Sequence, residues 1–331
     1  MEPLLEVQNL HVWYRVYGGY SKVLNGVNFL VNKGERVGLV GEAGCGKTTT
    51  MKTILRILPD QVSKIAQGKI LFNGQDILRM NGNTLQRIRS QGIAMIFQDP
   101  TAALNPVFTV GEQLSDVIRF SLRSIAQRKV EKKSIKQVAM QALKDVSMPD
   151  QERILGTYPI QLSGGMRQRV CISMAITTKR ELLIADEPGT SLDVTIQDQI
   201  LRLLHELVKQ KNTSIILITH SLGVTREMTD RIYVMYAGTM VETAKADELF
   251  ANPLHPYTLG LLASVPKLTG GGIARGIPGR LPDYRNPPPG CRFSPRCPRA
   301  MPVCEFSPPP FFAVGYEHKV ACYLFQESRN D

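Results

Sequence analysis

The sequence predicts an α/β fold in which a buried sheet of parallel strands carries polar side chains along one edge. Short apolar runs of strand length recur along the chain, and stretches with helical spacing of apolar residues separate them. Polar residues or a glycine-rich loop follow each run directly, as is typical of the carboxyl ends of parallel strands, where open α/β sheets bind ligands. The runs are Val37 to Val40, Ile93 to Phe97, Leu182 to Asp186 and Ile215 to Thr219.

The composition is that of a folded chain with room for two structural units. The 331 residues are 43% hydrophobic and 21% charged, which is ordinary for a globular protein. The segment Met1 to Leu10 is acidic and mixed, and no apolar stretch reaches the roughly 18 residues of a membrane span. We therefore expect a cytoplasmic chain with neither an export signal nor a spanning helix.

The net charge of +11 favours anionic partners but does not identify a particular one. The basic residues are dispersed over Arg119 to Lys144 and Arg275 to Arg299, and no arginine–aromatic pattern accompanies them. A solvated basic surface is therefore expected, and direct binding of nucleic acid is not. Nucleotide binding and proximity to a membrane both suit this sign of charge.

The segment GEAGCGKTTT, Gly41 to Thr50, fits the pattern G-x-x-x-x-G-K-[ST] and follows the first apolar run. Glycines let successive N–H groups point inward, and the helix that follows presents its positive end to phosphates. Lys47 adds a mobile cation, and the hydroxyl of Thr48 is expected on Mg²⁺. A plain glycine turn is the alternative. The expected phosphate-binding residues are Gly41, Glu42, Ala43, Gly44, Cys45, Gly46, Lys47, Thr48 and Thr49.

Residues 5 to 40 are predicted to form short strands joined by turns, among them Leu5 to Val7 and Val12 to Tyr14. An exposed aromatic residue in such a sheet, just before a phosphate loop, can stack on a nucleotide base. Tyr14 is the candidate, and Trp13, on the opposite strand face, is the alternative. Ordinary packing of both rings within the sheet explains them nearly as well.

Polar side chains at the later strand ends are suited to phosphoryl transfer. Gln98 is expected to reach Mg²⁺ and the attacking water, and Asp186 to hold Mg²⁺ through water. Glu187 is placed to orient and deprotonate that water. A lone histidine is usually structural, yet His220 follows a strand at the same sheet edge as Lys47, so we expect it to contact the γ-phosphate.

Two further stretches have helical character. Thr109 to Val146 has apolar residues at helical spacing and predicts a helical insert. In Leu162 to Gln168, LSGGMRQ, Ser163 is a plausible N-cap of a helix that continues to Ala175. The serine hydroxyl, the bare N–H groups of the two glycines and the helix N-terminus together predict a second anion site.

With these segments in this order, the chain closely resembles the nucleotide-binding subunits of ABC transporters. LSGGMRQ is the most specific match, because it separates this family from other P-loop ATPases. The matching residues are GEAGCGKT for the Walker A loop, Gln98 for the Q-loop, LSGGMRQ for the signature, LLIADE for Walker B, Ser191-Leu192-Asp193 for the D-loop and His220 for the switch histidine.

The resemblance implies a P-loop ABC ATPase core over residues 1–250, with an antiparallel β subdomain and a helical subdomain at about 99–164. It also implies a head-to-tail dimer, in which ATP lies between Lys47 of one subunit and the signature residues of the other. Glu187 is then the general base. The residues implied on the nucleotide from the signature and the D-loop are Ser163, Gly164, Gly165 and Asp193.

The tail looks like that of the dipeptide and oligopeptide importer ATPases, through Asn252 to Thr258, NPLHPYT, and the cysteines that follow. This implies an ATPase at the cytoplasmic face of the membrane that drives peptide import. Its implied partners are two membrane permease subunits, a second ATPase that is either identical or merely similar, and, indirectly, an extracytoplasmic solute-binding protein. Import of nickel or another small solute is the alternative within transport. A soluble ABC ATPase acting on nucleic acid or ribosomes is the alternative outside it, although the chain has no tandem ATPase module and no long heptad insert.

Four of the six cysteines lie in the extension 251–331, as Cys291, Cys297, Cys304 and Cys322, with spacing C-x5-C-x6-C-x17-C. In a reducing compartment this indicates a metal site before a disulfide framework. The absence of closely paired cysteines favours iron–sulfur over zinc. The resemblance likewise implies a [4Fe–4S] cluster, while Zn²⁺, with His318 as a substitute ligand, and free thiols remain alternatives.

We expect the role of this site to be structural, because the proline-rich tail has little core of its own; redox or iron sensing is the alternative. The other two cysteines are predicted to differ. Cys171 lies in an apolar helix and is expected to be buried. Cys45 adjoins a helix N-terminus that favours its thiolate, so oxidation there is a possible block to ATP binding.

Overall fold

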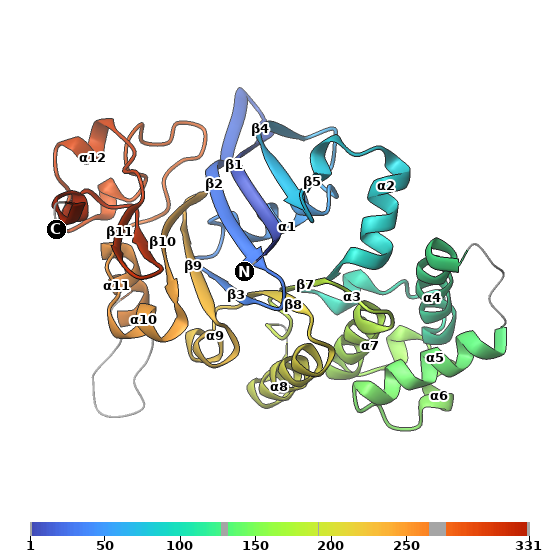
Figure 1. Ribbon diagram of the computed structural model, residues 1–331. Coiled ribbons are helices and arrows are strands. Elements are labelled where there is room, and N and C mark those ends of the chain that lie inside the picture. Colours follow the sequence, from blue (N-terminus) through green and yellow to red (C-terminus); the bar gives the residue numbers. More distant parts are fainter. Residues whose placement is uncertain (1, 127–131, 191, 265–275, 330–331) are drawn as a thin grey trace. The chain divides into compact units, whose positions relative to one another are not determined.

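Figure 1 shows the computed structural model, which divides into two compact units. The first unit joins Met1–Asn32, Arg36–Arg79 and Thr219–Asp331, and the second joins Lys33–Glu35 and Met80–Ile218. The structure describes residues 2–126, 132–190, 192–264 and 276–329. The domain boundary at residue 250 and the helical subdomain at about 99–164 remain predictions.

In the first unit, an antiparallel sheet has the strand order β2-β1-β4-β5. Its strands are β1 (Pro3–Val16), β2 (Gly19–Asn32), β4 (Ser63–Phe72) and β5 (Gln75–Asp76). The division of residues 5–14 into two short strands is wrong: both belong to β1, which forms one long hairpin with β2 whose register shifts repeatedly, for example between Val7 and Leu10. Such bulges break the alternation of inward and outward residues, so a continuous strand resembles several short ones in sequence.

The second sheet of the first unit begins with β3 (Arg36–Val40), which lies parallel to β9 (Arg231–Tyr236). Antiparallel strands then follow in the order β9-β10-β12-β11. The last two come from the C-terminal extension. These strands are β10 (Thr239–Lys245), β11 (Phe312–Gly315) and β12 (His318–Val320), and the helices of the unit are α1 (Lys47–Ile54), α9 (Leu222–Met228), α10 (Ala246–Ala251), α11 (Pro256–Ala263) and α12 (Val303–Phe306).

The extension shares a buried core with the rest of its unit. Phe293 is 2% exposed, and its ring centroid lies 5.0 Å from that of Tyr236 and 5.5 Å from that of Tyr257, both fully buried. The fully buried Glu242 of β10 accepts hydrogen bonds from the N–H of His255 and lies 2.8 Å from Nε2 of His318 in β12. Aromatic and polar contacts therefore join the extension to the rest of its unit, because the proline-rich segments carry a few large side chains inward.

In the second unit, three parallel strands have the order β8-β7-β6, as the apolar runs predict. The predicted helical stretch from Thr109 to Val146 includes α4 and α5, and the residues between these helices lie outside the described part of the chain. The strands are β6 (Ile93–Ile96), β7 (Leu182–Asp186) and β8 (Ser214–Ile218). The helices are α2 (Gly82–Arg87), α3 (Pro100–Ala103), α4 (Val110–Ala126), α5 (Lys132–Asp145), α6 (Gln151–Leu155), α7 (Gly164–Ile176) and α8 (Val194–Lys211). Across the described residues of both units, no helix combines the length and the apolar character needed to cross a membrane.

Candidate functional site

The glycine-rich loop lies between β3 and α1, as predicted, and its glycines are required by the backbone. Gly41 and Gly46 have φ angles of 154° and 109°, and Gly44 has 79°. A Cβ at Gly41 would lie 2.1 Å from the carbonyl oxygen of Met235, so a side chain there would displace the loop from β9. The loop conformation therefore depends on residues that tolerate positive φ and close backbone approach.

Lys47, the first residue of α1, turns its side chain back onto this loop. Its Nζ donates hydrogen bonds to the carbonyl oxygens of Gly41 at 2.7 Å and Glu42 at 3.0 Å. The residue is 5% exposed, so the loop holds a buried cation against its own carbonyls. This charge, together with the N-terminus of α1, is what an anionic phosphate needs.

The surroundings of Cys45 disfavour the oxidation that its place beside a helix N-terminus suggested. Its Sγ is fully buried and lies 3.8 Å from Nζ of Lys47. Burial raises the pKa of this thiol, and the opposing effect of the lysine charge is smaller. A buried, protonated thiol is a poor target for oxidation, because the thiolate is the reactive form.

Tyr14 and Trp13 lie in different surroundings. The hydroxyl of Tyr14 is 3.5 Å from Oγ1 of Thr49, in the first turn of α1. Trp13 instead lies near Tyr20, with the ring centroids 5.9 Å apart, and near the ammonium of Lys64. Of the two aromatic residues, Tyr14 is therefore the one next to the helix that follows the loop. Its role as a base platform stays a prediction.

In the second unit, the ends of β6 and β7 bring two predicted residues together. Nε2 of Gln98 donates a hydrogen bond to Oε2 of Glu187 at 2.9 Å, and both Glu187 and the adjacent Asp186 are buried. Glu187 has a left-handed φ of 49°, while its N–H still donates to the carbonyl of Ile218 at 2.9 Å. A non-glycine residue held in this region is strained, and such strain gathers at functional sites. Sequence alone carried no signal for this backbone geometry.

The signature segment begins α7 as predicted, with Ser163 as the N-cap whose Oγ accepts from the N–H of Met166. The two glycines also have a packing role. A Cβ at Gly164 would lie 3.0 Å from Leu192, and one at Gly165 would lie 2.8 Å from Ile196. A side chain at Gly165 would displace Ile196 in the first turn of α8, so this glycine permits close packing in addition to any need for bare N–H groups.

Asp193 has a structural partner, because its carboxylate caps α8 by accepting from the N–H of Ile196 at 3.0 Å. Ser191 of the predicted D-loop lies outside the described residues. His220 follows β8 and is exposed. Lys47, Thr48 and His220 belong to the first unit, and Gln98, Asp186, Glu187 and the signature belong to the second.

Three residues of the C-terminal extension, none of them indicated by a sequence pattern, contact the phosphate loop. Arg296 forms an ion pair with Glu42, Tyr257 accepts a hydrogen bond from the N–H of Glu42, and Tyr284 donates one to the carbonyl of Gly44. The partners in these contacts lie 215 to 254 residues apart in the sequence. No local pattern signals such contacts, because only the tertiary fold brings the segments together.

The four cysteines of the extension gather in one neighbourhood and form no disulfide. Burial, together with the smaller effect of the other three thiols, raises the pKa of Cys291 to about 11. The N–H of Cys291 donates to the carbonyl of Cys304 at 2.8 Å. Even so, the described residues include no group of three or more histidine, cysteine or acidic side chains that could hold a metal ion. His318, the possible substitute ligand, lies against Glu242.

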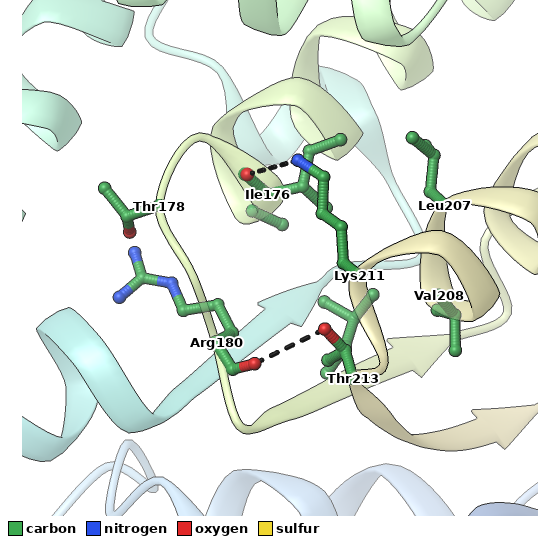
Figure 2. A pocket seen from close by; sticks show the side chains of 9 residues that line it. Ile176, Thr178, Arg180, Leu207, Val208, Lys211 and Thr213 are labelled. Carbon is green, nitrogen blue, oxygen red and sulfur yellow. Dashed lines mark hydrogen bonds between the residues drawn. The ribbon is translucent and has the colours of Figure 1, made fainter. Parts of the chain in front are cut away.

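A small cavity in the second unit, shown in Figure 2, is not part of this site. Its volume of about 10 Å³ has room for roughly one water molecule. Arg180, which lines it, precedes β7, whereas Asp186 lies at the other end of that strand. The guanidinium of Arg180 points toward Thr178, and burial lowers its pKa to about 10. A cavity of this size at the amino end of the sheet cannot hold a nucleotide.

Comparisons with known proteins agree with this geometry. The model of the ABC transporter family matches residues 24–190, and that of the oligopeptide/dipeptide transporter C-terminal region matches residues 241–304. The dipeptide transport ATP-binding protein DppD of Bacillus subtilis is 45% identical over 98% of this chain and 95% of its own length. The oligopeptide transport ATP-binding protein OppD of the same organism is 44% identical over 97% of this chain and 88% of its own length.

Among solved structures, cbiO1 from Clostridium perfringens, part of the ABC transporter complex cbiONQ, has a TM-score of 0.62 and 26% identity, covering 76% of this chain and 92% of its own. The likeness confirms the predicted α/β ATPase fold. A near-complete match at 45% identity leaves little room for a different architecture. The chain belongs to the ATP-binding proteins of ABC transporters, in the branch that carries the oligopeptide/dipeptide transporter C-terminal region.

Proposed function

We propose that this chain binds and hydrolyses ATP to power the import of dipeptides or oligopeptides through separate membrane subunits. The observation that carries the proposal is the match of residues 241–304 to the C-terminal region of oligopeptide and dipeptide transporters, beside the complete set of ATPase motifs. The chain then works as a peripheral protein at the cytoplasmic face of the membrane. Its partners are two permease subunits and a second ATPase, which is another copy of this chain or a similar one.

The nucleotide is proposed to bind through the phosphate loop and the buried ammonium of Lys47, with Tyr14 beside the base. Mg²⁺ prefers oxygen ligands, and Thr48, Gln98 and Asp186 supply a hydroxyl, an amide and a carboxylate of that kind. When bound, this ion neutralises charge on the phosphates. The set therefore suits Mg²⁺ in its donor chemistry.

Glu187 is the proposed general base. It is buried, and its Oε2 accepts a hydrogen bond from Gln98 at 2.9 Å, which fixes the direction of the carboxylate. A carboxylate oriented in this way can take a proton from the attacking water. His220 is proposed to contact the γ-phosphate, and the signature residues Ser163 to Gly165, with Asp193, to complete the site of the other subunit in the dimer.

Transport of peptides can be tested directly by uptake. In cells that depend on this chain and its membrane subunits, deletion of the chain should abolish accumulation of radiolabelled dialanine, and the wild-type chain should restore it. Radioactive nickel measured in parallel serves as the competing solute. Loss of nickel uptake with normal dialanine uptake would replace the peptide assignment with a small-solute one. Unchanged uptake of both would contradict a role in import.

The four-cysteine group is proposed to hold a [4Fe–4S] cluster. In support, Cys291 lies close enough to the other three cysteines for their thiols to raise its pKa, and all four are free thiols. The spacing C-x5-C-x6-C-x17-C lacks the close cysteine pairs of most zinc sites, so a cluster is proposed in preference to Zn²⁺. The cluster would link the segments that carry these four cysteines through covalent bonds to iron.

Metal analysis tests this proposal. Protein purified without oxygen should contain about four irons and four acid-labile sulfides per chain, the content of one cubane cluster. Replacing Cys304 with serine should remove them, whereas Cys171→Ser, in α7, should not. One zinc per chain, or no metal, would overturn the cluster and leave the ATPase assignment standing.

A further inference from the structure

We propose that Arg296 and Tyr284 of the C-terminal extension are positioning residues that hold the phosphate loop in its nucleotide-binding shape. The inference rests on the proposed function in one respect, namely that this loop binds ATP. It assigns to the extension an effect on nucleotide affinity, carried by contacts inside the first unit.

Arg296 is joined to the phosphate loop by a two-pronged ion pair. Its Nη1 lies 2.8 Å from Oε2 of Glu42, and its Nη2 lies 3.0 Å from Oε1. The side chain of Arg296 is 5% exposed, and that of Glu42 is 27% exposed. A guanidinium bound to both oxygens of a carboxylate fixes its orientation as well as its distance, so the pair constrains the second residue of the loop.

The remaining donors of Arg296 are also used. Nε donates to the carbonyl of Pro278 at 2.8 Å, Nη2 to that of Ile277 at 3.0 Å, and Nη1 to the hydroxyl of Tyr236 at 3.3 Å. With the two bonds to Glu42, all five N–H groups of the guanidinium have acceptors. Because all its donors are used, this guanidinium has no alternative arrangement of equal energy, so it fixes the position of Glu42 relative to the extension.

Two tyrosines hold the backbone of the same loop. The hydroxyl of Tyr284 donates to the carbonyl of Gly44 at 2.7 Å, and the hydroxyl of Tyr257 accepts from the N–H of Glu42 at 2.8 Å. Gly44 has a φ of 79°, in the left-handed region that glycine adopts most readily. The bond from Tyr284 holds the carbonyl of this residue in place.

A second arginine is linked to the loop indirectly. Arg292 donates to the carbonyl of Ala237, and Gly238, which follows Ala237, donates its N–H to the carbonyl of Cys45 at 2.7 Å. Arg292 follows Cys291 in the chain, and Arg296 precedes Cys297. Any interaction that fixes Cys291 and Cys297 therefore also fixes the backbone next to Arg292 and Arg296.

The experiment measures Mg-ATP affinity of the full chain by titration calorimetry, for the wild type, Arg296→Met, Glu42→Gln and the double variant. We expect about tenfold weaker binding for Arg296→Met, within the usual range for coupling between sites. The double variant should bind no more weakly than the weaker single variant, because both changes break one link. The loss should fall on KM for ATP and leave kcat nearly unchanged.

Two further variants separate positioning from simple folding of the extension. Tyr284→Phe removes one hydroxyl, keeps the ring, and should weaken ATP binding several-fold. Arg285→Met breaks an exposed pair with Asp283 in the same segment and should leave ATP affinity unchanged. If Arg296→Met is unstable, the ATP affinity of Tyr284→Phe alone tests the positioning role.

Affinities within twofold of wild type for both Arg296→Met and Tyr284→Phe would overturn the positioning role while leaving the ATPase assignment intact. A wild-type chain that binds no ATP would instead overturn the proposed function, and the positioning role with it.

Discussion

Replacing Glu187 with glutamine should lower ATP turnover by about 100-fold or more, because a general base contributes roughly 10²- to 10⁴-fold to a rate. ATP binding should persist. Glutamine has the same shape, and its amide oxygen can accept the hydrogen bond that Gln98 now donates to Oε2 at 2.9 Å. Phosphate release and equilibrium binding of Mg-ATP, measured on the same preparation, separate the two effects.

The chain offers a matched control for this variant. Glu181 is an exposed glutamate that immediately precedes the same strand, β7, whereas Glu187 immediately follows it. Glu181→Gln makes the same chemical change, and we expect wild-type turnover from it. Full turnover in Glu187→Gln would remove Glu187 from the role of base and direct attention to another group that activates water.

Replacing Lys47 with alanine should weaken ATP binding itself, by roughly 10- to 100-fold, because hydrogen bonds to charged groups contribute about 1.5–3 kcal/mol each. The ammonium is 5% exposed and lies within 3.0 Å of two loop carbonyls, so its loss removes the buried positive charge of the loop. Binding of a fluorescent ATP analogue measures the effect.

Lys52→Ala is the control for this second variant, since Lys52 lies in the last turn of the same helix, α1. Its affinity for ATP should match that of the wild type. The melting temperature of each variant shows whether the loop has lost its fold or only its charge. Unchanged ATP affinity in a folded Lys47→Ala chain would contradict the proposed phosphate contact.

Local patterns predicted the elements that carry the site. Gly41 to Gly46 forms a loop between strand and helix because the glycine positions and the preceding apolar run act over a few residues. The N-cap at Ser163 follows from its place before α7 in the same way. The strand ends at Gln98 and Asp186 could be placed for a similar reason, since β6 and β7 are short apolar runs in parallel register.

Other features were beyond such patterns. The bulges in β1 and β2 divided one long hairpin into apparent fragments. The helix terminus beside Cys45 suggested a thiolate, but full burial outweighs it, and burial is a property of the fold. The left-handed backbone of Glu187 likewise depends on its hydrogen bond to Ile218, a residue 31 positions along the chain.

The sequence by itself determined the fold class, the family and the identity of the chemical groups, because motif spacing and strand length are local properties of the chain. Only the tertiary structure decided which groups meet. The contacts from Arg296, Tyr257 and Tyr284 to the phosphate loop span more than two hundred residues. Their geometry arises when Phe293 and its aromatic neighbours pack the extension against the rest of its unit, and packing of this kind leaves no periodic trace in the sequence.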